Sequence, residues 1–237
     1  SGVELIEGKA RFTNNKEVEV NGKTYSADTF LIATGGWPFI PDFPGKEYAI
    51  SSNEIFDLET FPKRLVVVGG GYIAVEFAGI FHGMGAEVTQ LYRGELFLRG
   101  FDSDLRTHLR DCMLTSGIDV RFKRDVASIT QTSTGLKVTL KSGETLDADQ
   151  VLYATGRVAN TKGLGLENTQ VTLSSSGVIE VDEVSKTSAG HIYAIGDVTD
   201  RMNLTPVAIH EAMCFVDHYL KIEDRSPDYS NIATAVF

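Results

Sequence analysis

The sequence predicts an α/β fold in which a unit built on a parallel sheet is inserted into a second domain. Two features of the chain lead to this prediction. Residues 64–99 run through an apolar strand, a glycine turn, a helix and a second strand, as a parallel βαβ unit requires. Strands that end in Ala-Thr-Gly lie on both sides of this unit, at 33–35 and 154–156, which indicates that one domain is interrupted by another.

The glycine turn is the most specific motif in the chain. It follows Leu65–Val68, a short β-branched strand typical of a sheet covered on both faces. In the pattern Gly-x-Gly-x-x-Gly/Ala, Gly69 permits the tight turn, Gly71 lets the backbone approach a pyrophosphate, and Ala74 lets the helix pack closely. The free N–H groups at the start of the helix Tyr72–Met84 would face the phosphates. We therefore predict a Rossmann-like dinucleotide-binding domain.

The end of the second strand indicates which dinucleotide binds. An NAD-binding unit places a carboxylate there, about 20 residues past the glycines, to hold the ribose 2′-hydroxyl. Here the strand Glu87–Tyr92 ends in an aromatic residue and is followed by Arg93, with Arg99 six positions later. Guanidinium groups hold a 2′-phosphate well, so NADPH is the predicted cofactor. The alternative is that both arginines are ordinary solvated surface residues.

Composition and charge restrict the remaining possibilities. The chain has 237 residues, 42% apolar and 23% charged, enough for one large domain or two small ones. The net charge of −10 disfavours a nucleic acid partner, and no apolar run is long enough to cross a membrane. Without a signal peptide, we expect a cytoplasmic protein. The histidines form no metal-binding array, and Cys112 and Cys214 match no redox motif, so both thiols are expected to be buried in the core.

The rest of the chain predicts further strands, two more helices and a segment that crosses between domains. Asn21-Gly22 predicts a hairpin turn between Glu17–Val20 and Lys23–Tyr25. Prolines at 38, 41 and 44 indicate a crossing between domains. A helix from Asp102 to Ser116 is capped by Asp102 or Ser103, and Pro206 begins another. The other predicted strands are Thr29–Ala33, Asp119–Phe122, Val126–Thr130, Leu136–Leu140, Glu144–Leu146, Gln150–Ala154 and His191–Ile195.

A carboxylate follows the last of these strands, in Gly196-Asp197. A carboxylate directly after a glycine at the end of a strand suits a sugar or polyol hydroxyl. The alternative is an aspartate that caps a helix or turn.

Four motifs in the same order resemble the two-dinucleotide flavoprotein disulfide reductases. They are Gly-Gly-Gly-Tyr-Ile-Ala-Val-Glu (69–76), Ala-Thr-Gly-Arg (154–157), Tyr-Ala-Ile-Gly-Asp (193–197) and Leu-Thr-Pro-Val-Ala (204–208). Within this family the chain is most similar to the glutathione reductases. The arginine pair in YRGELFLRGFD favours NADPH-dependent members over the lipoamide dehydrogenases, whereas trypanothione reductases share a similar segment.

The resemblance implies roles for residues that match the family motifs. Tyr72 would cover the flavin and move aside for the nicotinamide, although a tyrosine here could also be a packing residue. Glu76 would pair with a lysine near the flavin. The residues implied for NADPH are Gly69, Gly71, Tyr72, Ile73, Ala74, Arg93, Arg99, Gly156 and Arg157, and those for FAD are Thr34, Gly35, Asp197 and Thr205.

The same resemblance implies a central piece of a longer enzyme. The expected parts are FAD-domain strands at 1–36, an NADPH-binding domain with a parallel sheet and a β-meander at 37–158, a further FAD-domain or central segment at 159–232, and the start of an interface domain at 233–237. The family's first FAD fingerprint, its redox cysteine pair and its acid-base histidine have no counterpart here. We expect this piece to be inactive alone, and to lack the parts needed to retain FAD and to form the family's homodimer.

The complete protein is expected to reduce glutathione disulfide with NADPH, through FAD and the cysteine pair. Three alternatives remain open. One is another family member, of the trypanothione or lipoamide type. A second is a flavin oxidoreductase without a cysteine pair, such as a ferredoxin or quinone reductase. The third is a non-catalytic NADPH-binding module.

Overall fold

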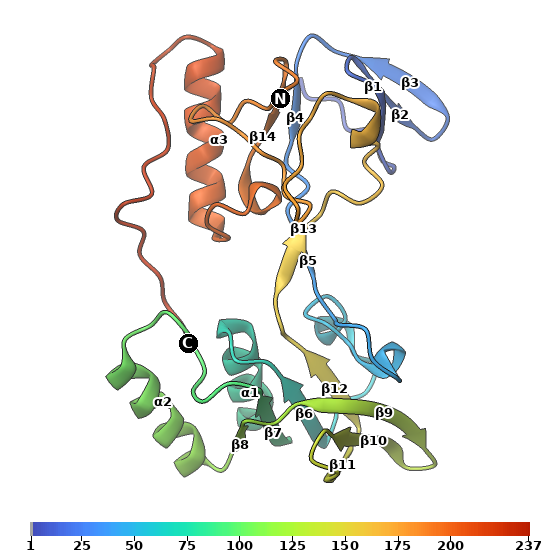
Figure 1. The fold of residues 1–237 in the computed structure, drawn as a ribbon, viewed down its shortest axis with the longest axis vertical. Helices are drawn as coiled ribbons and strands as arrows, with labels where there is room; N and C mark the ends of the chain where they lie inside the picture. The colour runs from blue at the N-terminus through green and yellow to red at the C-terminus, as the bar shows by residue number, and fades with distance from the viewer. Residues whose placement is uncertain (1) are drawn as a thin grey trace. The chain divides into compact units, whose positions relative to one another are not determined.

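The computed structural model describes residues 2–237, which divide into two compact units (Figure 1). The first unit combines the chain up to Trp37 with Val158–Ala233, and the second holds Pro38–Arg157 with Thr234–Phe237. The short strands β5 (Gly36–Pro38) and β13 (Arg157–Ala159), where the chain passes from one unit to the other, pair with each other.

A four-stranded parallel sheet forms the centre of the second unit. Its order is β12 (Gln150–Tyr153), β6 (Arg64–Val68), β7 (Glu87–Tyr92) and β8 (Asp119–Phe122). Strand β6 is covered on both faces, as its apolar composition predicts. Leu65 and Val67 belong to the core on the helix side, and Val66 and Val68 belong to the core on the other side.

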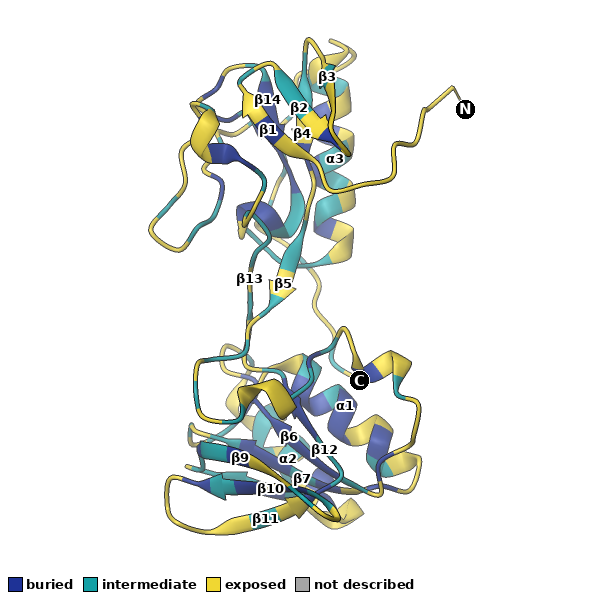
Figure 2. Cartoon of the chain, turned by 90° about the vertical axis from the view of Figure 1, so that its right-hand side faces the viewer, coloured by how far each residue is buried: buried dark blue, intermediate teal, exposed yellow. Residues whose placement is uncertain are grey.

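Two helices cover one face of this sheet. Helix α1 (Tyr72–Gly83) buries five apolar side chains against it, drawn in dark blue in Figure 2. Helix α2 (Ser103–Ser116) begins at Asp102, whose side chain accepts the backbone N–H groups of Asp104 and Leu105. Asp102, and not Ser103, is therefore the residue that caps this helix.

An antiparallel meander covers the other face. It consists of β9 (Val126–Thr132), β10 (Gly135–Leu140) and β11 (Thr145–Ala148), with β10 in the middle. Their inward residues join the second core, where the rings of Phe43 and Tyr153 stack with centroids 5.0 Å apart. The predicted α/β class, with a parallel sheet and a β-meander, is confirmed.

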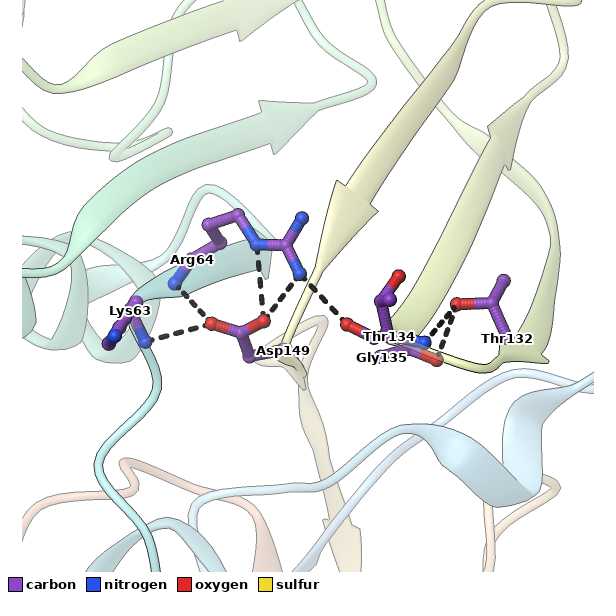
Figure 3. A network of polar contacts seen from close by, with 6 residues as sticks. All are labelled: Lys63, Arg64, Thr132, Thr134, Gly135 and Asp149. Carbon is purple, nitrogen blue, oxygen red and sulfur yellow. Dashed lines mark hydrogen bonds and ion pairs between the residues drawn. The ribbon is translucent and has the colours of Figure 1, made fainter.

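A polar clip joins the meander to the start of β6 (Figure 3). Asp149 accepts the backbone N–H groups of Lys63 and Arg64, both at 2.9 Å, and pairs with the Arg64 guanidinium at 2.5 Å. The same guanidinium donates to the carbonyl oxygen of Thr134, in the β9–β10 turn, at 3.1 Å. The guanidinium holds the pKa of the Asp149 carboxyl below its usual range. The Asp149 carboxylate thus accepts the backbone N–H groups of Lys63 and Arg64 at the start of β6.

The first unit contains a smaller set of strands and one long helix. Strands β1 (Arg11–Asn14), β2 (Glu17–Val20) and β3 (Lys23–Ser26) form an antiparallel sheet. Strand β4 (Phe30–Ile32) pairs in parallel with β14 (Ile192–Ala194). Helix α3 (Thr205–Tyr219) buries Val207, Glu211, Cys214 and Phe215.

The β2–β3 turn has the backbone that its sequence predicts. Asn21 has φ 52° and Gly22 has φ 77°, the two left-handed residues of a type I′ turn. Strand β1 was not predicted, because its four residues bury only Phe12 and show no apolar alternation. Within residues 2–237, no helix is long and apolar enough to cross a membrane.

Candidate functional site

The first two glycines of the turn between β6 and α1 are required by packing. Gly69 has φ 149°, and a Cβ atom there would lie 2.3 Å from the carbonyl oxygen of Ala154. A Cβ atom on Gly70 would lie 2.4 Å from the ring of Tyr92. Larger residues at these positions would force the turn away from the neighbouring strands.

Gly71 differs because the space in front of it is empty. It has an extended backbone with φ −88°, and a Cβ atom there would meet nothing within 4 Å. Gly71 is the N-cap of α1, and no side chain caps the first N–H groups of this helix. Ala74 is fully buried and would lie 3.1 Å from a Cβ atom on Gly69, so the helix packs closely on its strand. The arrangement leaves a backbone cradle with free N–H groups and a positive helix end, which fits a pyrophosphate.

Two neighbouring segments hold the glycine turn in place. The side chain of Gln90, fully buried in β7, donates from Nε2 to the Gly69 carbonyl at 3.1 Å. The backbone N–H of Leu98 donates to the Gly70 carbonyl at 2.6 Å. The turn is thereby fixed before any ligand binds, which reduces the conformational entropy that is lost on binding.

The two predicted arginines lie on the segment that follows β7. We call Arg93–Arg99 the arginine loop. Both terminal arginines are exposed, and neither forms an ion pair within residues 2–237. The one carboxylate in the loop, Glu95, pairs with Lys123 at 2.9 Å, and this contact lowers the pKa of Glu95. The loop contacts the glycine turn through the N–H of Leu98 and carries two arginines without an ion-pair partner among the described residues, while its own negative charge is balanced.

The other residues predicted to contact NADPH also belong to the second unit. Tyr72 is the first residue of α1, and 40% of it is exposed. Ile73 is half-buried and packs against the helix-side core. Gly156 follows β12 with φ 138° and accepts the N–H of Phe39 at 2.9 Å, and Arg157 begins β13.

Glu76, predicted to pair with a lysine, lies one turn into α1. It is half-buried, and its Oε1 atom accepts the backbone N–H of Phe237 at 3.4 Å. The structure therefore places Glu76 beside the last residue of the chain. Its pairing with a lysine stays a prediction.

The four residues predicted for FAD all belong to the first unit. Thr34 and Gly35 follow β4, where the Thr34 hydroxyl donates to the Asn160 carbonyl at 2.9 Å. The Gly35 carbonyl accepts the N–H of Asn160 at 2.9 Å, and Gly35 has φ 69° with empty space in front of it. Because the Thr34 hydroxyl donates its proton to Asn160, it can only accept a hydrogen bond from a ligand. Thr205, at the start of α3, is exposed.

A buried carboxylate supports the turn that carries Asp197. This turn is the 3₁₀ helix η4 (Gly196–Thr199), and the N–H of Gly196 donates to Glu211 at 2.6 Å. Glu211 is 1% exposed, accepts the Tyr229 hydroxyl at 2.7 Å and pairs with Arg201 at 3.2 Å. Burial and this hydrogen bond raise the pKa of Tyr229 above its usual range, so its hydroxyl remains a donor. Glu211, which lies on α3, thus holds the Gly-Asp turn in place against this helix.

The cysteines correct one expectation from the sequence. Cys214 is buried as predicted, but Cys112 is exposed on α2, with its Sγ atom 3.5 Å from Nε2 of His108. The prediction for Cys112 was wrong because it treated the thiol as a core residue, whereas α2 buries only Met113. Within residues 2–237, no group of three or more histidine, cysteine, aspartate or glutamate side chains could hold a metal ion.

The parallel sheet, the glycine turn and the uncapped start of α1 define the class of Rossmann-like dinucleotide-binding proteins. Residues 1–212 match the family described as pyridine nucleotide-disulphide oxidoreductase. The chain belongs to this family, as its four motifs predict.

Relatives within the family have names that agree with the sequence-based resemblance. The chain is 47% identical over 237 residues to a glutathione reductase of Burkholderia cepacia, covering 100% of the chain and 53% of that protein. It is 46% identical over 215 residues to a trypanothione reductase of Trypanosoma congolense, covering 89% of the chain and 44% of that protein. The chain spans about half the length of the curated relatives it matches.

A solved structure with a similar fold is the HOCl-induced flavoprotein disulfide reductase RclA from Escherichia coli. The TM-score is 0.90 at 30% sequence identity, over 94% of this chain and 52% of that one. The Rossmann-like fold predicted from the sequence is therefore confirmed.

Three supporting residues were not predicted from the sequence. Gln90 holds the glycine turn, Arg106 donates to the arginine loop, and Glu211 holds the Gly-Asp turn. Gln90 and Glu211 had a detectable signal, since each is a polar residue at an apolar position of its element. Arg106 had none, because its partners are backbone carbonyls that only the tertiary structure brings near.

Proposed function

We propose that this chain carries the NADPH-binding part of a flavoprotein disulfide reductase whose substrate is glutathione disulfide. The observation that supports NADPH most directly is the pair of exposed, unpaired arginines beside an uncapped helix start. The free N–H groups at Gly71 and the first turn of α1 would hold the pyrophosphate, and Arg93 and Arg99 would hold the 2′-phosphate. Gly156 and Arg157 would contact the nicotinamide nucleotide.

The flavin part of the proposal concerns the first unit. Thr34, Gly35, Asp197 and Thr205 would contact FAD, and the exposed ring of Tyr72 would shield the flavin until the nicotinamide displaces it. When bound, NADPH would supply a hydride for FAD, and the flavin would supply the electrons that reduce a disulfide. The two cysteines of this chain lie in different units and 102 positions apart in sequence, so we expect no turnover of glutathione disulfide by the chain alone.

The NADPH assignment is tested by replacing both arginines. Charge-assisted hydrogen bonds contribute about 1.5–3 kcal/mol each, so Arg93→Ala with Arg99→Ala should weaken NADPH binding by at least about 100-fold. NADH has no 2′-phosphate, so its affinity should change little. Calorimetric titration of the 237-residue chain with both nucleotides measures the two effects. Equal losses for NADPH and NADH would show that the arginines are structural.

A second substrate is favoured by a specific observation, the 46% identity to a trypanothione reductase. The full-length protein, assayed with NADPH and either glutathione disulfide or trypanothione disulfide, distinguishes the two. We propose glutathione disulfide as the substrate because of the 47% identity to a glutathione reductase of Burkholderia cepacia. We also propose a homodimeric full-length protein and a cytoplasmic location, as the resemblance of the sequence implies. Sedimentation of the full-length protein and cell fractionation test the last two.

A further inference from the structure

We infer that Arg106 is a positioning residue for NADPH selectivity, because it holds the arginine loop in the shape that presents Arg93 and Arg99. This inference rests on the NADPH site proposed above. Arg106 lies on α2, outside the loop, and no motif includes it. Its contribution would be indirect, through backbone groups.

The arginine loop has no regular secondary structure and is held at separate points. The Gly94 carbonyl accepts the N–H of Lys123 at 3.0 Å, and the N–H of Leu98 donates to Gly70 at 2.6 Å. Phe97 is fully buried, with its ring centroid 5.6 Å from that of Phe122. The loop therefore has one fixed path between β7 and α2.

Arg106 adds two further contacts, both made by its side chain. Its Nε atom donates to the Phe97 carbonyl and its Nη2 atom donates to the Leu96 carbonyl, both at 2.6 Å. Two donors in one rigid plane match two adjacent carbonyls, which an ammonium group on a flexible chain does not. The guanidinium thus fixes the orientation of two successive peptide groups in the loop.

The position of Leu98 shows why this orientation matters. Leu98 has φ 54°, which is a left-handed conformation. This conformation is energetically unfavourable for any residue that has a Cβ atom. The peptide groups before it face α2, its own N–H faces the glycine turn, and Arg99 follows directly. Without Arg106, the loop would relax from this conformation. Binding of the 2′-phosphate of NADPH would then have to order Arg99, at a cost in conformational entropy.

The consequence differs between the two nicotinamide nucleotides. Only NADPH carries the 2′-phosphate that the ordered arginines would contact, so loss of order lowers its affinity selectively. We expect Arg106→Ala to weaken NADPH binding by about 10-fold and to change NADH binding by less than about 2-fold. Arg106→Lys keeps the charge but loses the two-carbonyl contact, so its NADPH loss should approach that of Arg106→Ala.

Arg110→Ala is the matched control. Arg110 lies one turn later on α2, carries the same charge and pairs with Asp111 at 2.7 Å. Its removal changes the net charge equally without touching the loop. Calorimetric titrations of the 237-residue parent chain and the three variants with NADPH and NADH, each with a urea unfolding curve, form the experiment.

The expected result is a lower ratio of NADPH to NADH affinity in both Arg106 variants and a parental ratio in Arg110→Ala. A parental ratio in Arg106→Lys would overturn the inference, because charge alone would then account for the effect. Equal losses for both nucleotides would overturn it too, since that is the result of general loss of structure. If Arg106→Ala does not fold, Arg106→Lys decides. A parent chain with no preference for NADPH would instead refute the proposed function, and this inference with it.

Discussion

Replacing Gly71 with valine should weaken nucleotide binding without harming the fold. Gly71 has φ −88°, which any residue adopts, and a Cβ atom there meets nothing within 4 Å. We therefore expect the free energy of unfolding of Gly71→Val to stay within about 1 kcal/mol of the parent, allowing for the poorer N-cap. The added side chain would occupy the space into which a pyrophosphate must come. Losing one charge-assisted hydrogen bond costs about 1.5–3 kcal/mol, so NADPH affinity should fall about 10- to 150-fold.

Gly69→Ala is the contrasting variant in the same turn. Its Cβ atom would lie 2.3 Å from the Ala154 carbonyl oxygen, at a φ of 149°. We expect it to lower the free energy of unfolding by about 1–3 kcal/mol. Urea unfolding and calorimetric NADPH titration of both variants measure the difference. If Gly71→Val binds NADPH as tightly as the parent, the space in front of α1 is not where the pyrophosphate lies, and the reasoning fails.

Two buried or partly buried carboxylates allow further predictions. Glu211→Ala leaves the Gly196 N–H and the Tyr229 hydroxyl without an acceptor and should cost about 3–5 kcal/mol in urea unfolding. A loss below about 1 kcal/mol would contradict the supporting role. Asp149→Asn should cost about 1–2 kcal/mol at pH 7, since both partners are about one-third exposed. Because Arg64 lowers the pKa of Asp149 in the folded state, this contribution is present above the ordinary aspartate pKa and is lost as pH falls through the lowered value. The parent and the Asn variant should therefore converge in stability in acid, and a constant difference would exclude this contribution.

The second unit could be predicted well because local sequence and tertiary environment agree there. Leu65–Val68 is uniformly apolar, and the strand that it forms is buried on both faces. The residues of the glycine turn show the same agreement, because the conformations of Gly69 and Gly71 match the roles that the motif assigns.

The residues that support the site could not be predicted in the same way. The two donors of Arg106 contact carbonyls nine and ten positions earlier, and nothing in the spacing distinguishes Arg106 from Arg110. The exposure of Cys112 was missed because residue type alone favours burial, whereas the position of α2 on the sheet decides it. Interactions of this kind depend on how helices and strands pack against one another, and the local sequence pattern does not encode that packing.

The pairing of β4 with β14 has a consequence for the order of folding during synthesis. These strands join residues 30–32 with residues 192–194, and the whole parallel sheet of the second unit lies between them in the chain. Every strand of that sheet is made before β14, since synthesis proceeds from the N-terminus at about 5–20 residues per second. The inserted unit can therefore become ordered while the β4–β14 pair still lacks one of its strands. Closing so long a loop is entropically less costly once its interior is compact, so early folding of the inserted unit would favour the later pairing of β4 with β14.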